Sequence, residues 1–349
     1  MNILGMFSKQ KYTAALVGLG RIGFSLGLDE KREQPASHTM AFLNNKRIEV
    51  VSGIDTDIQK ADEWKRFMEE RKQSPKIFYS SSEFYEKFDG KIPDIITVAV
   101  NESSHMEECL LAIKAKPKLV ILEKPVALNT DEAEKIRAAA EESGVPVMVN
   151  HERRFAADYN AAKSFIDRIG SIQSVRAELC SGLRVYAPKF EEDGSYSLLH
   201  DGTHLVDIVS FLLDETLSNP TVTGIFKDEE GIVRNFTAQF KTEKIPEIEI
   251  YMSGRSKFFS FGVDILGTTG RIQIGNGYAD FYEAEESKLY TGFKSLAKQN
   301  VKLPKKTGYF SNMIQNAVDF LDGKAELKSP LKNAMEDLRT LEEIKRFLQ

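Results

Sequence analysis

A glycine-rich turn near the amino terminus limits what this chain can fold into. The apolar run at residues 14–17 leads directly into Gly18-Leu19-Gly20-Arg21-Ile22-Gly23, which predicts a buried parallel strand entering a tight turn. In a dinucleotide fold such glycines provide the turn, let the backbone approach a pyrophosphate and allow close helix–strand packing, and the next helix points its N-terminus at the phosphates. The dinucleotide-binding residues predicted from this pattern are Gly18, Gly20, Arg21, Ile22 and Gly23.

An acidic residue closes the second predicted strand. Asp55 follows residues 48–54 and is placed to accept hydrogen bonds from ribose hydroxyls, while its carboxylate repels a 2′-phosphate; NAD is therefore favoured over NADP. The interval from Gly23 to Asp55 is longer than the usual spacing of about 20 residues, which indicates an insertion around residues 25–37. Arg21 could reach a 2′-phosphate, so NADP stays an alternative. Without a ligand, Asp55 reads as an exposed turn residue and the glycines as an ordinary turn.

Strand and helix patterns alternate through residues 10–150. Apolar strand-length runs occupy residues 95–100, 119–122 and 145–149, and helical patterns cover 60–71, 106–115 and 130–140. This alternation is typical of a doubly wound parallel sheet. We therefore predict an α/β chain whose first domain, 10–150, is a dinucleotide-binding Rossmann domain.

The pattern of apolar and polar residues changes after Asn150, where strand patterns separated by short turns become common. They lie at residues 172–179, 221–226, 235–240, 247–252, 258–266 and 271–274, and helices are expected at 198–213 and 313–347. We predict that 151–349 form an α/β domain with a large, mostly antiparallel open sheet that binds substrate and supports oligomerisation. Because the open sheet face needs covering, we expect a homodimer or homotetramer.

The composition narrows the function classes. A hydrophobic content of 42% with 28% charged residues is that of a globular chain, and a net charge of −5 offers no excess of cations for nucleic acid. Cys109 and Cys180 lack metal-ligand spacing, so we expect neither a metal site nor a disulfide framework. No apolar run reaches the roughly 20 residues of a membrane helix, and residues 1–12 lack the apolar core of a secretion signal. We therefore expect a cytoplasmic protein with no membrane partner.

Further motifs follow in a fixed order along the chain. They are the GLGRIG turn, the strand end GID at 53–55, EKP at 123–125, NHERRF at 150–155, DGTHLVD at 201–207 and GTTGRI at 267–272. In this order they resemble the Gfo/Idh/MocA oxidoreductase family from end to end. The resemblance implies NAD(P)-dependent hydride transfer between a nicotinamide and a hydroxyl-bearing carbon of a sugar, sugar nucleotide or cyclitol. It thus implies a carbohydrate-like small molecule as substrate.

The resemblance assigns catalytic roles to two residues. Lys124 matches the lysine of the family's EKP motif, which sits where nicotinamide and substrate meet, and an ammonium there can stabilise an alkoxide or relay a proton. Without the motif, Lys124 reads as a surface lysine. His204 matches the family's catalytic histidine, and an imidazole with an unperturbed pKa of about 6.5 suits removal of a hydroxyl proton. With these roles, Lys124 and His204 are expected to point into one cleft and to contact the substrate.

The chain departs from the family pattern four residues before His204. The family commonly has an aspartate there, whereas this chain has His200, followed by Asp201. On a helix His200, His204 and Asp207 share one face. Asp201 can replace the missing aspartate in catalysis and substrate binding, or His200 can take that role itself.

Several other residues are candidates for ligand contacts. Asn101, Glu102 and His105 follow the fourth strand at the sheet edge where ligands bind in α/β folds, although His105 can equally be a helix-start residue. Glu123 joins Lys124 as a predicted cofactor contact. Asn150, Arg153 and Arg154 open the second domain; an arginine there can bind an anionic substrate group or form an inter-domain salt bridge. The following residues lie in a predicted substrate lid: Arg184, Tyr186 and Lys189.

Two other functions fit the same sequence. One is a redox-assisted lyase, epimerase or hydrolase that keeps NAD tightly bound and shows no net cofactor turnover. The other is a non-catalytic dinucleotide-binding sensor, which the His200 departure favours. The retention of Lys124 and His204 argues against the sensor.

Overall fold

The computed structural model describes residues 10–87 and 90–349, and these divide into two compact units. The first unit holds the chain up to Glu123 together with Lys135–Asn150 and Phe310–Pro330. The second holds Lys124–Glu134, His151–Tyr309 and Leu331–Gln349. The chain thus passes between the units more than once, and the division into a dinucleotide-binding domain at 10–150 and a substrate and oligomerisation domain at 151–349 stays a prediction.

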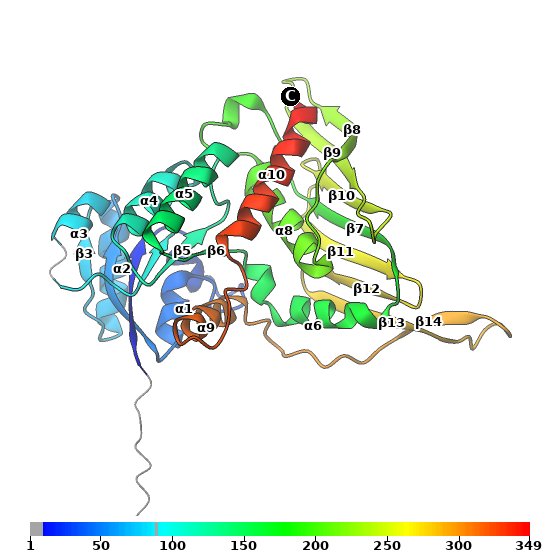
Figure 1. Ribbon diagram of the computed structural model, residues 1–349, viewed down its shortest axis with the longest axis horizontal. Helices are drawn as coiled ribbons and strands as arrows, with labels where there is room; N and C mark the ends of the chain where they lie inside the picture. Colours follow the sequence, from blue (N-terminus) through cyan, green and yellow to red (C-terminus); the bar gives the residue numbers. More distant parts are fainter. Residues whose placement is uncertain (1–9, 88–89) are drawn as a thin grey trace, which may run out of the picture. The chain divides into compact units, whose positions relative to one another are not determined.

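The first unit is built on a six-stranded parallel sheet in the order β3-β2-β1-β4-β5-β6 (Figure 1). All four residues of β4 and β6 and all five of β5 are buried, as expected for strands covered on both faces. This confirms the predicted doubly wound fold. The strands are β1 Tyr12–Val17, β2 Ile48–Ile54, β3 Lys76–Phe78, β4 Ile95–Val98, β5 Leu119–Glu123 and β6 Val147–Asn150.

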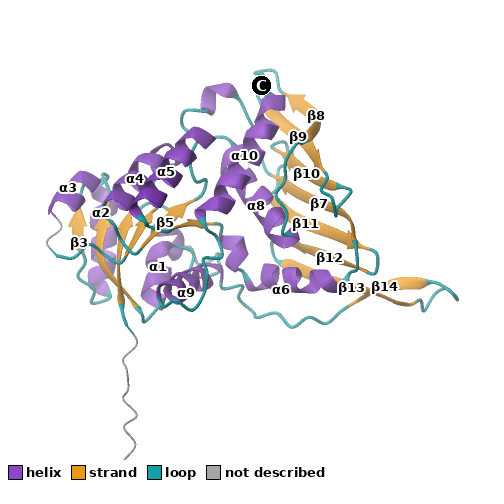
Figure 2. Cartoon of the chain, viewed as in Figure 1, coloured by secondary structure: helices purple, strands orange, loops and turns teal. Residues whose placement is uncertain are grey.

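Helices lie on both sides of this sheet, with α1 and α9 on one side and α4 and α5 on the other (Figure 2). The order of the strands reverses between β1 and β4, and in open α/β sheets ligands bind at the carboxyl ends of strands at such a point. The helices are α1 His38–Asn44, α2 Ile58–Glu70, α3 Ser81–Lys87, α4 His105–Lys114, α5 Thr130–Ser143 and α9 Tyr309–Leu321.

The helix expected directly after the glycines is split by the insertion. One turn forms, in which the N–H of Phe24 donates to the carbonyl of Gly20 (2.8 Å), and a short 3₁₀ helix, η1 (Ser25–Leu28), follows. The helix resumes only at α1, where the N–H of His38 donates to the Ile22 carbonyl (3.1 Å) and that of Thr39 to the Gly23 carbonyl (3.0 Å). In an uninterrupted helix the carbonyls of Ile22 and Gly23 would instead accept from the N–H groups four residues farther along the chain. The insertion therefore loops out while α1 stays stacked on the glycine turn.

The segment containing α9 belongs to the first unit although it lies near the end of the chain. Just after α9, the Asp322 carboxylate accepts two bonds from the Arg47 guanidinium (2.8 and 3.1 Å) and one from the Tyr12 hydroxyl (2.8 Å). Hydrogen bonds from Arg47, Lys324 and Tyr12 hold the pKa of Asp322 far below its ordinary value. A bidentate arginine–carboxylate pair fixes geometry as well as charge, so it anchors this segment beside β1 and β2.

The second unit contains an eight-stranded sheet in the order β14-β13-β12-β11-β7-β10-β9-β8. The neighbours β7 and β10 run parallel and the other neighbours antiparallel, which confirms the predicted mostly antiparallel sheet. The strands are β7 Ile172–Cys180, β8 Thr221–Lys227, β9 Val233–Phe240, β10 Ile248–Ser253, β11 Ser260–Gly267, β12 Gly270–Gly275, β13 Tyr278–Glu286 and β14 Lys294–Lys298.

Helices cover one face of the second sheet, and Figure 1 shows α8 and α10 lying along it. On β7 the side chains of Val175, Ala177 and Leu179 are buried beneath these helices, while Arg176 and Glu178 point outward. The helices are α6 Ala157–Phe165, α7 Ser197–His200, α8 Gly202–Leu213 and α10 Leu331–Leu348.

The sheet face opposite the helices was expected to be an apolar interface between subunits, but it carries many polar side chains. Its outward residues include the charged pair of β7 and the bonded Asp264 and Arg271 of β11 and β12. Exposed apolar side chains occur at several loops of this unit, and near the turn that joins β13 to β14 Leu289, Tyr290 and Phe293 are each at least 66% exposed. Within the part of the chain that the structure describes, no helix has the length and apolar character to cross a membrane.

Candidate active site

The glycine turn leaves one side open for a ligand. Gly18 adopts a φ of +95°, and a Cβ there would lie 2.3 Å from the Ala99 carbonyl oxygen. A Cβ on Gly23 would lie 2.1 Å from the Gly18 oxygen, whereas one on Gly20 would meet nothing within 4 Å. Two glycines are therefore required by packing, and the third gives open backbone that a pyrophosphate can approach.

Asp55 lies directly beside this turn. One of its carboxylate oxygens accepts a hydrogen bond from the Leu19 N–H (2.8 Å) and the other from the Asp57 N–H (2.9 Å). Each oxygen keeps a second lone pair, which suits acceptance from ribose hydroxyls. The glycine turn and Asp55 therefore fit a dinucleotide, and Arg21 beside them is exposed.

The candidates that follow β4 fall into two groups. Asn101 is exposed and Glu102 half-buried, so both can be reached by a ligand. His105 is 1% exposed, its Nε2 lies 3.2 Å from the Val100 carbonyl oxygen, and α4 begins at this residue. The structure thus favours the helix-start alternative for His105.

Glu123 is held by a buried cluster. Its Oε1 lies 2.6 Å from Nε2 of His38 and accepts a hydrogen bond from Nδ2 of Asn150 (2.7 Å), and all three residues are at most 4% exposed. The imidazole of His38 also packs edge-on against Phe310 at 5.2 Å between ring centroids. Glu123 is thus engaged within the protein, and its predicted cofactor contact is not supported by an exposed carboxylate. The cluster joins α1, β5 and β6 at the position just before Lys124.

Lys124 is bonded next to the catalytic histidine candidate. Its Nζ donates to the backbone carbonyl of His200 at 2.9 Å, and both residues belong to the second unit. The side chain of Lys124 is half-buried and that of His200 is exposed. The bond uses only the backbone of His200, so any residue at position 200 could accept it.

His204 lies in the first turn of α8 and is half-buried. Burial of the imidazole is the largest cause that holds the pKa of His204 well below its ordinary value, followed by the nearby positive charges of Lys124, Arg153, His151 and His200. A histidine whose pKa is lowered in this way is neutral at physiological pH. It can therefore accept a proton.

The predicted helix at 198–213 is broken at Asp201 into α7 and α8. The Asp201 carboxylate accepts a hydrogen bond from the Ser197 hydroxyl (2.6 Å), and its backbone carbonyl accepts one from the N–H of His204 (3.1 Å). Asp201 thus stabilises the entry into α8. These bonds do not link the side chain of His200 or Asp201 to the imidazole of His204. The catalytic roles of His200 and Asp201 stay predictions.

Beneath His204 lies a fully buried ionic network. The Asp207 carboxylate, one turn farther along α8, contacts Nδ1 of His151 (2.5 Å) and Nε of Arg154 (2.7 Å), while Asp337 of α10 lies 3.9 Å from the same His151 nitrogen. Burial is the main cause that raises the pKa of Asp337, and the neighbouring Asp207 charge adds to it. Of the two carboxyls, Asp337 is therefore the one that holds a proton to the higher pH.

His151, Asp207 and Asp337 each offer one ligand atom, and these atoms lie within 4.8 Å of one another. A cation could bridge such a group. However, Arg154 already supplies positive charge to Asp207, and the high pKa of Asp337 opposes a second anion. The network is balanced without a metal ion, and the expectation that the chain has no metal site stays a prediction.

The candidate substrate residues differ in accessibility. Arg153 is half-buried, its guanidinium carbon 3.9 Å from the centroid of the Phe261 ring. Arg184 stacks over Phe190 at 4.0 Å, and Lys189 is exposed. Tyr186, in contrast, is fully buried with its hydroxyl bonded to Glu191. The structure therefore places Tyr186 in the core, away from the surface of the predicted lid.

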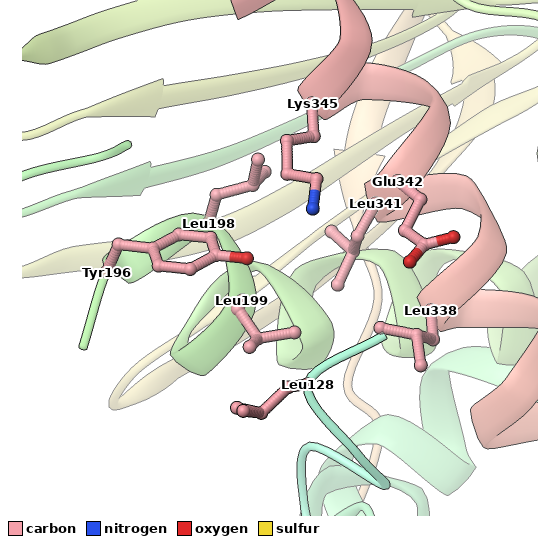
Figure 3. A pocket seen from close by; sticks show the side chains of 8 residues that line it. All are labelled: Leu128, Tyr196, Leu198, Leu199, Leu338, Leu341, Glu342 and Lys345. Atoms are coloured by element: carbon pink, nitrogen blue, oxygen red, sulfur yellow. The ribbon is translucent and has the colours of Figure 1, made fainter. Parts of the chain in front are cut away.

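A separate apolar pocket lies between α7 and α10 in the second unit (Figure 3). The carboxylate of Glu342 at this pocket accepts bonds from the Thr130 N–H (3.0 Å) and hydroxyl (2.7 Å). None of the predicted catalytic residues lines the pocket, so it is distinct from the site at His204. Its lining residues are Leu128, Tyr196, Leu198, Leu199, Leu338, Leu341, Glu342 and Lys345.

Sequence reasoning did not identify the two buried clusters as functional. His38 occupies the end of an insertion, and Asp337 sits within the amphipathic pattern of a terminal helix. One signal was available, because a charged residue among apolar helix positions such as Asp207 is rarely buried without a partner. The identity of those partners is set only by the tertiary fold.

The raised pKa of Asp337 predicts how stability depends on pH. The protonated carboxyl stabilises the fold at low pH, and this contribution is lost as pH rises from about 4 through the higher pKa of the folded state. The Asp337→Asn variant keeps a donor that cannot ionise, so at pH 8 it should equal or exceed the wild type by about 1–3 kcal/mol. Urea unfolding at several pH values measures this difference.

The control removes the partner carboxylate. Asp207→Asn leaves Arg154 without its buried anion and should cost about 3–5 kcal/mol of stability. The contradicting outcome is that the free energy of unfolding falls by the same amount with rising pH in the wild type and in Asp337→Asn. Asp337 would then be ionised in the folded protein as readily as in the unfolded chain.

Comparison with known proteins finds a family match for the Rossmann fold. Residues 12–151 match the Gfo/Idh/MocA model, described as an oxidoreductase family with an NAD-binding Rossmann fold. The NADP⁺-dependent scyllo-inositol 2-dehydrogenase IolW of Bacillus subtilis is 27% identical over 58% of this chain and 56% of its own length. The 1,5-anhydro-D-fructose reductase of Ensifer adhaerens is 28% identical over 51% of this chain and 56% of its length. The chain thus matches little more than half the length of these curated relatives.

Solved structures share the fold along nearly the whole chain. The WlbA dehydrogenase of Bordetella pertussis, solved with NADH and UDP-GlcNAcA, has a TM-score of 0.71 and 18% identity and covers 97% of this chain and 96% of its own. A dehydrogenase of Chromobacterium violaceum has a TM-score of 0.78 and 15% identity, with 97% and 95% covered. Residues 12–151 therefore match the NAD-binding Rossmann fold of the Gfo/Idh/MocA oxidoreductase family, and the two solved structures share the fold of nearly the whole chain.

Proposed function

We propose that this protein is an NAD(P)-dependent oxidoreductase that interconverts a hydroxyl and a carbonyl on a sugar, a sugar nucleotide or a cyclitol. The observation that carries the proposal is the pairing of Lys124 and His204 in the second unit, with Nζ of Lys124 bonded to the His200 carbonyl at 2.9 Å and a neutral imidazole beside it. The curated relatives, an inositol dehydrogenase and an anhydrofructose reductase, support this substrate class.

The cofactor fits the residues of the first unit. The open backbone at Gly20 would approach its pyrophosphate and Asp55 would accept from its ribose hydroxyls. A bound nicotinamide dinucleotide supplies the hydride acceptor or donor of the reaction.

The chain's own residues manage the charge and the proton. The Lys124 ammonium, fixed by the His200 carbonyl, would stabilise negative charge that develops on the substrate oxygen. The neutral imidazole of His204 would take the hydroxyl proton during oxidation and return it during reduction. Asp201, three residues before His204, is bonded to Ser197, and Asp207, three residues after it, is bonded to His151 and Arg154. These bonds would fix the orientation of the His204 imidazole.

The bonding of Asp55 predicts a preference for NAD(H) over NADP(H). A carboxylate that faces the ribose accepts from free hydroxyls and repels a 2′-phosphate. Calorimetric titration of the two cofactors should therefore give the lower Kd for NADH. Asp55→Ala should narrow the difference by removing the repulsion, and tighter binding of NADPH to the wild type would show that Arg21 or the 25–37 insertion determines the preference.

Catalysis should depend on Lys124 and His204. Replacing either with Ala should lower kcat by about 10²–10⁴-fold, the usual contribution of a positioned acid–base group, while the Kd for NADH changes little. Steady-state kinetics on a panel of sugars, cyclitols and nucleotide sugars tests this. Lys332, an exposed lysine 3.8 Å from Glu336, gives the control Lys332→Ala. Full activity in both Lys124→Ala and His204→Ala would refute the mechanism.

Two further variants separate the alternatives at the start of α8. His200→Ala keeps the backbone carbonyl that Lys124 uses, so a large loss of kcat would place the His200 imidazole in proton transfer. If Asp201→Ala is the damaging change instead, the carboxylate that bonds Ser197 is the group that matters.

The protein is also proposed to be a homodimer or homotetramer. The exposed apolar side chains near the β13–β14 turn, Leu289, Tyr290 and Phe293, support an interface there. Light scattering at micromolar concentration should give a mass above that of one chain, and Tyr290→Glu with Phe293→Glu should lower it. A monomeric wild type would refute the proposal.

A further inference from the structure

We propose that Arg153 binds a negatively charged group of the substrate, so that the substrate is an acidic sugar derivative carrying a carboxylate or a phosphate. This inference rests on the proposed function, because it places the anion in the site of Lys124 and His204. The two anions share one recognition chemistry, since both accept two parallel hydrogen bonds from a guanidinium.

The contacts of Arg153 are incomplete for an arginine so little exposed. Its side chain is 15% exposed, and the structure gives it one acidic partner within the described residues, the adjacent Glu152, at 3.5 Å. That distance is at the limit of a hydrogen bond, and a guanidinium carries five donors. The Phe261 ring, 3.9 Å from the guanidinium carbon, covers one of its faces and fixes its plane. Arg153 is therefore held in place with most of its donors still available.

Two neighbouring arginines show what a satisfied guanidinium looks like in this chain. Arg154 donates to Asp207 (2.7 Å) and Asn333 (3.2 Å). Arg168 stacks on Phe165 at 4.5 Å and binds both carboxylate oxygens of Glu283 (2.8 and 2.9 Å). Arg153 has the same aromatic stacking as Arg168 but, in place of a bidentate carboxylate, only one contact to Glu152 at 3.5 Å. The position that Glu283 fills at Arg168 is the position assigned to the substrate anion at Arg153.

Tyr159 provides a second polar group beside Arg153. The residue is 4% exposed, and its hydroxyl finds no acceptor among the described residues. Burial is the main cause that raises the pKa of Tyr159, and Arg153 opposes it through its charge and a side-chain hydrogen bond, so the two groups lie close together. A guanidinium only donates, so the buried hydroxyl hydrogen still lacks an acceptor, which is unfavourable. An anion bound by Arg153 would give this hydroxyl an acceptor.

Arg153 also belongs to the same site as the catalytic residues. It lies in the 3₁₀ turn Glu152–Phe155, which packs against α8, the helix that carries His204. Besides burial, its charge lowers the pKa of His204 together with that of Lys124. Two described acids on α8 and at its start already have partners, since Asp207 contacts Arg154 and His151, and Asp201 accepts from Ser197. Within the described part of the chain, the carboxylate that contacts Arg153 is that of Glu152. The surroundings of His204 therefore favour a ligand that brings negative charge.

The inference is tested by binding and by kinetics, with glucuronate and glucose 6-phosphate as acidic probes and glucose and myo-inositol as neutral ones. Calorimetry in the presence of NADH should show that the wild type binds an acidic probe at least ~10-fold more tightly than the neutral ones. Arg153→Gln should remove this preference, because it removes the charged donor that binds the anion. The preferred acidic probe distinguishes a carboxylate from a phosphate.

Matched variants separate recognition from folding. Arg153→Lys keeps the positive charge but cannot donate two parallel hydrogen bonds, so it should bind the acidic probe with intermediate affinity. Glu152→Gln should strengthen binding by removing the competing carboxylate. The control Arg168→Gln loses a stacked, paired arginine and should leave the preference unchanged. For Arg153→Gln the loss should appear in KM more than in kcat.

The outcomes also separate this inference from the proposed function. Acidic binding that depends on Arg153 in a protein without turnover would refute the oxidoreductase mechanism and keep the anion site. Equal binding of acidic and neutral probes, or a preference that survives in Arg153→Gln, would overturn the anion site whatever the activity.

Discussion

The buried carboxylate of Asp207 sets the arrangement of the second unit. A charge that is fully removed from water must be matched by opposite charge and hydrogen bonds, and Asp207 obtains these from His151 and Arg154 at 2.5 and 2.7 Å. Both partners lie in the segment that leaves β6, and Asp337 brings in the last helix of the chain. One carboxylate thus joins three distant segments. Since His204 lies one turn before Asp207 on α8, the same network fixes the imidazole proposed as the catalytic base.

A second constraint acts in the first unit, where the start of α1 contacts both the glycine turn and the end of β5. The insertion at 25–37 separates α1 from the turn in sequence, yet the N–H groups of His38 and Thr39 return to the carbonyls of Ile22 and Gly23. The imidazole of His38 then reaches Glu123, eighty-five residues away. A change in the glycine turn can therefore be transmitted to the residue that precedes Lys124. This offers a physical reason for placing a buried histidine at the point where the helix resumes.

Much of the fold could be predicted because its strands are continuous or alternating apolar runs. The strand at 48–54 is found with the predicted bounds, and most others agree within one or two residues. The strands β13 and β14 were not predicted, because their charged and half-exposed residues resemble a loop. The helix predicted at 198–213 breaks at Asp201, whose side chain bonds back to Ser197. Local patterns also cannot show that α9 joins the first unit, since the Asp322–Arg47 pair that anchors it spans most of the chain. The candidate site follows the same rule, because motifs identified Lys124 and His204 but not their partners.

The charge around His204 connects the proposed chemistry to the proposed substrate. Burial, and then the nearby charges of Lys124 and Arg153, keep the imidazole neutral and so oppose its protonation, which is what a base undergoes when it accepts the hydroxyl proton. In a low-dielectric site this opposition is not screened by water. An anion bound at Arg153 would offset the charge of that guanidinium and make the protonated imidazole easier to form. A neutral substrate would leave the full repulsion in place. The arrangement therefore ties recognition to reactivity, because the group that would bind at Arg153 is also the group that would let His204 act as a base.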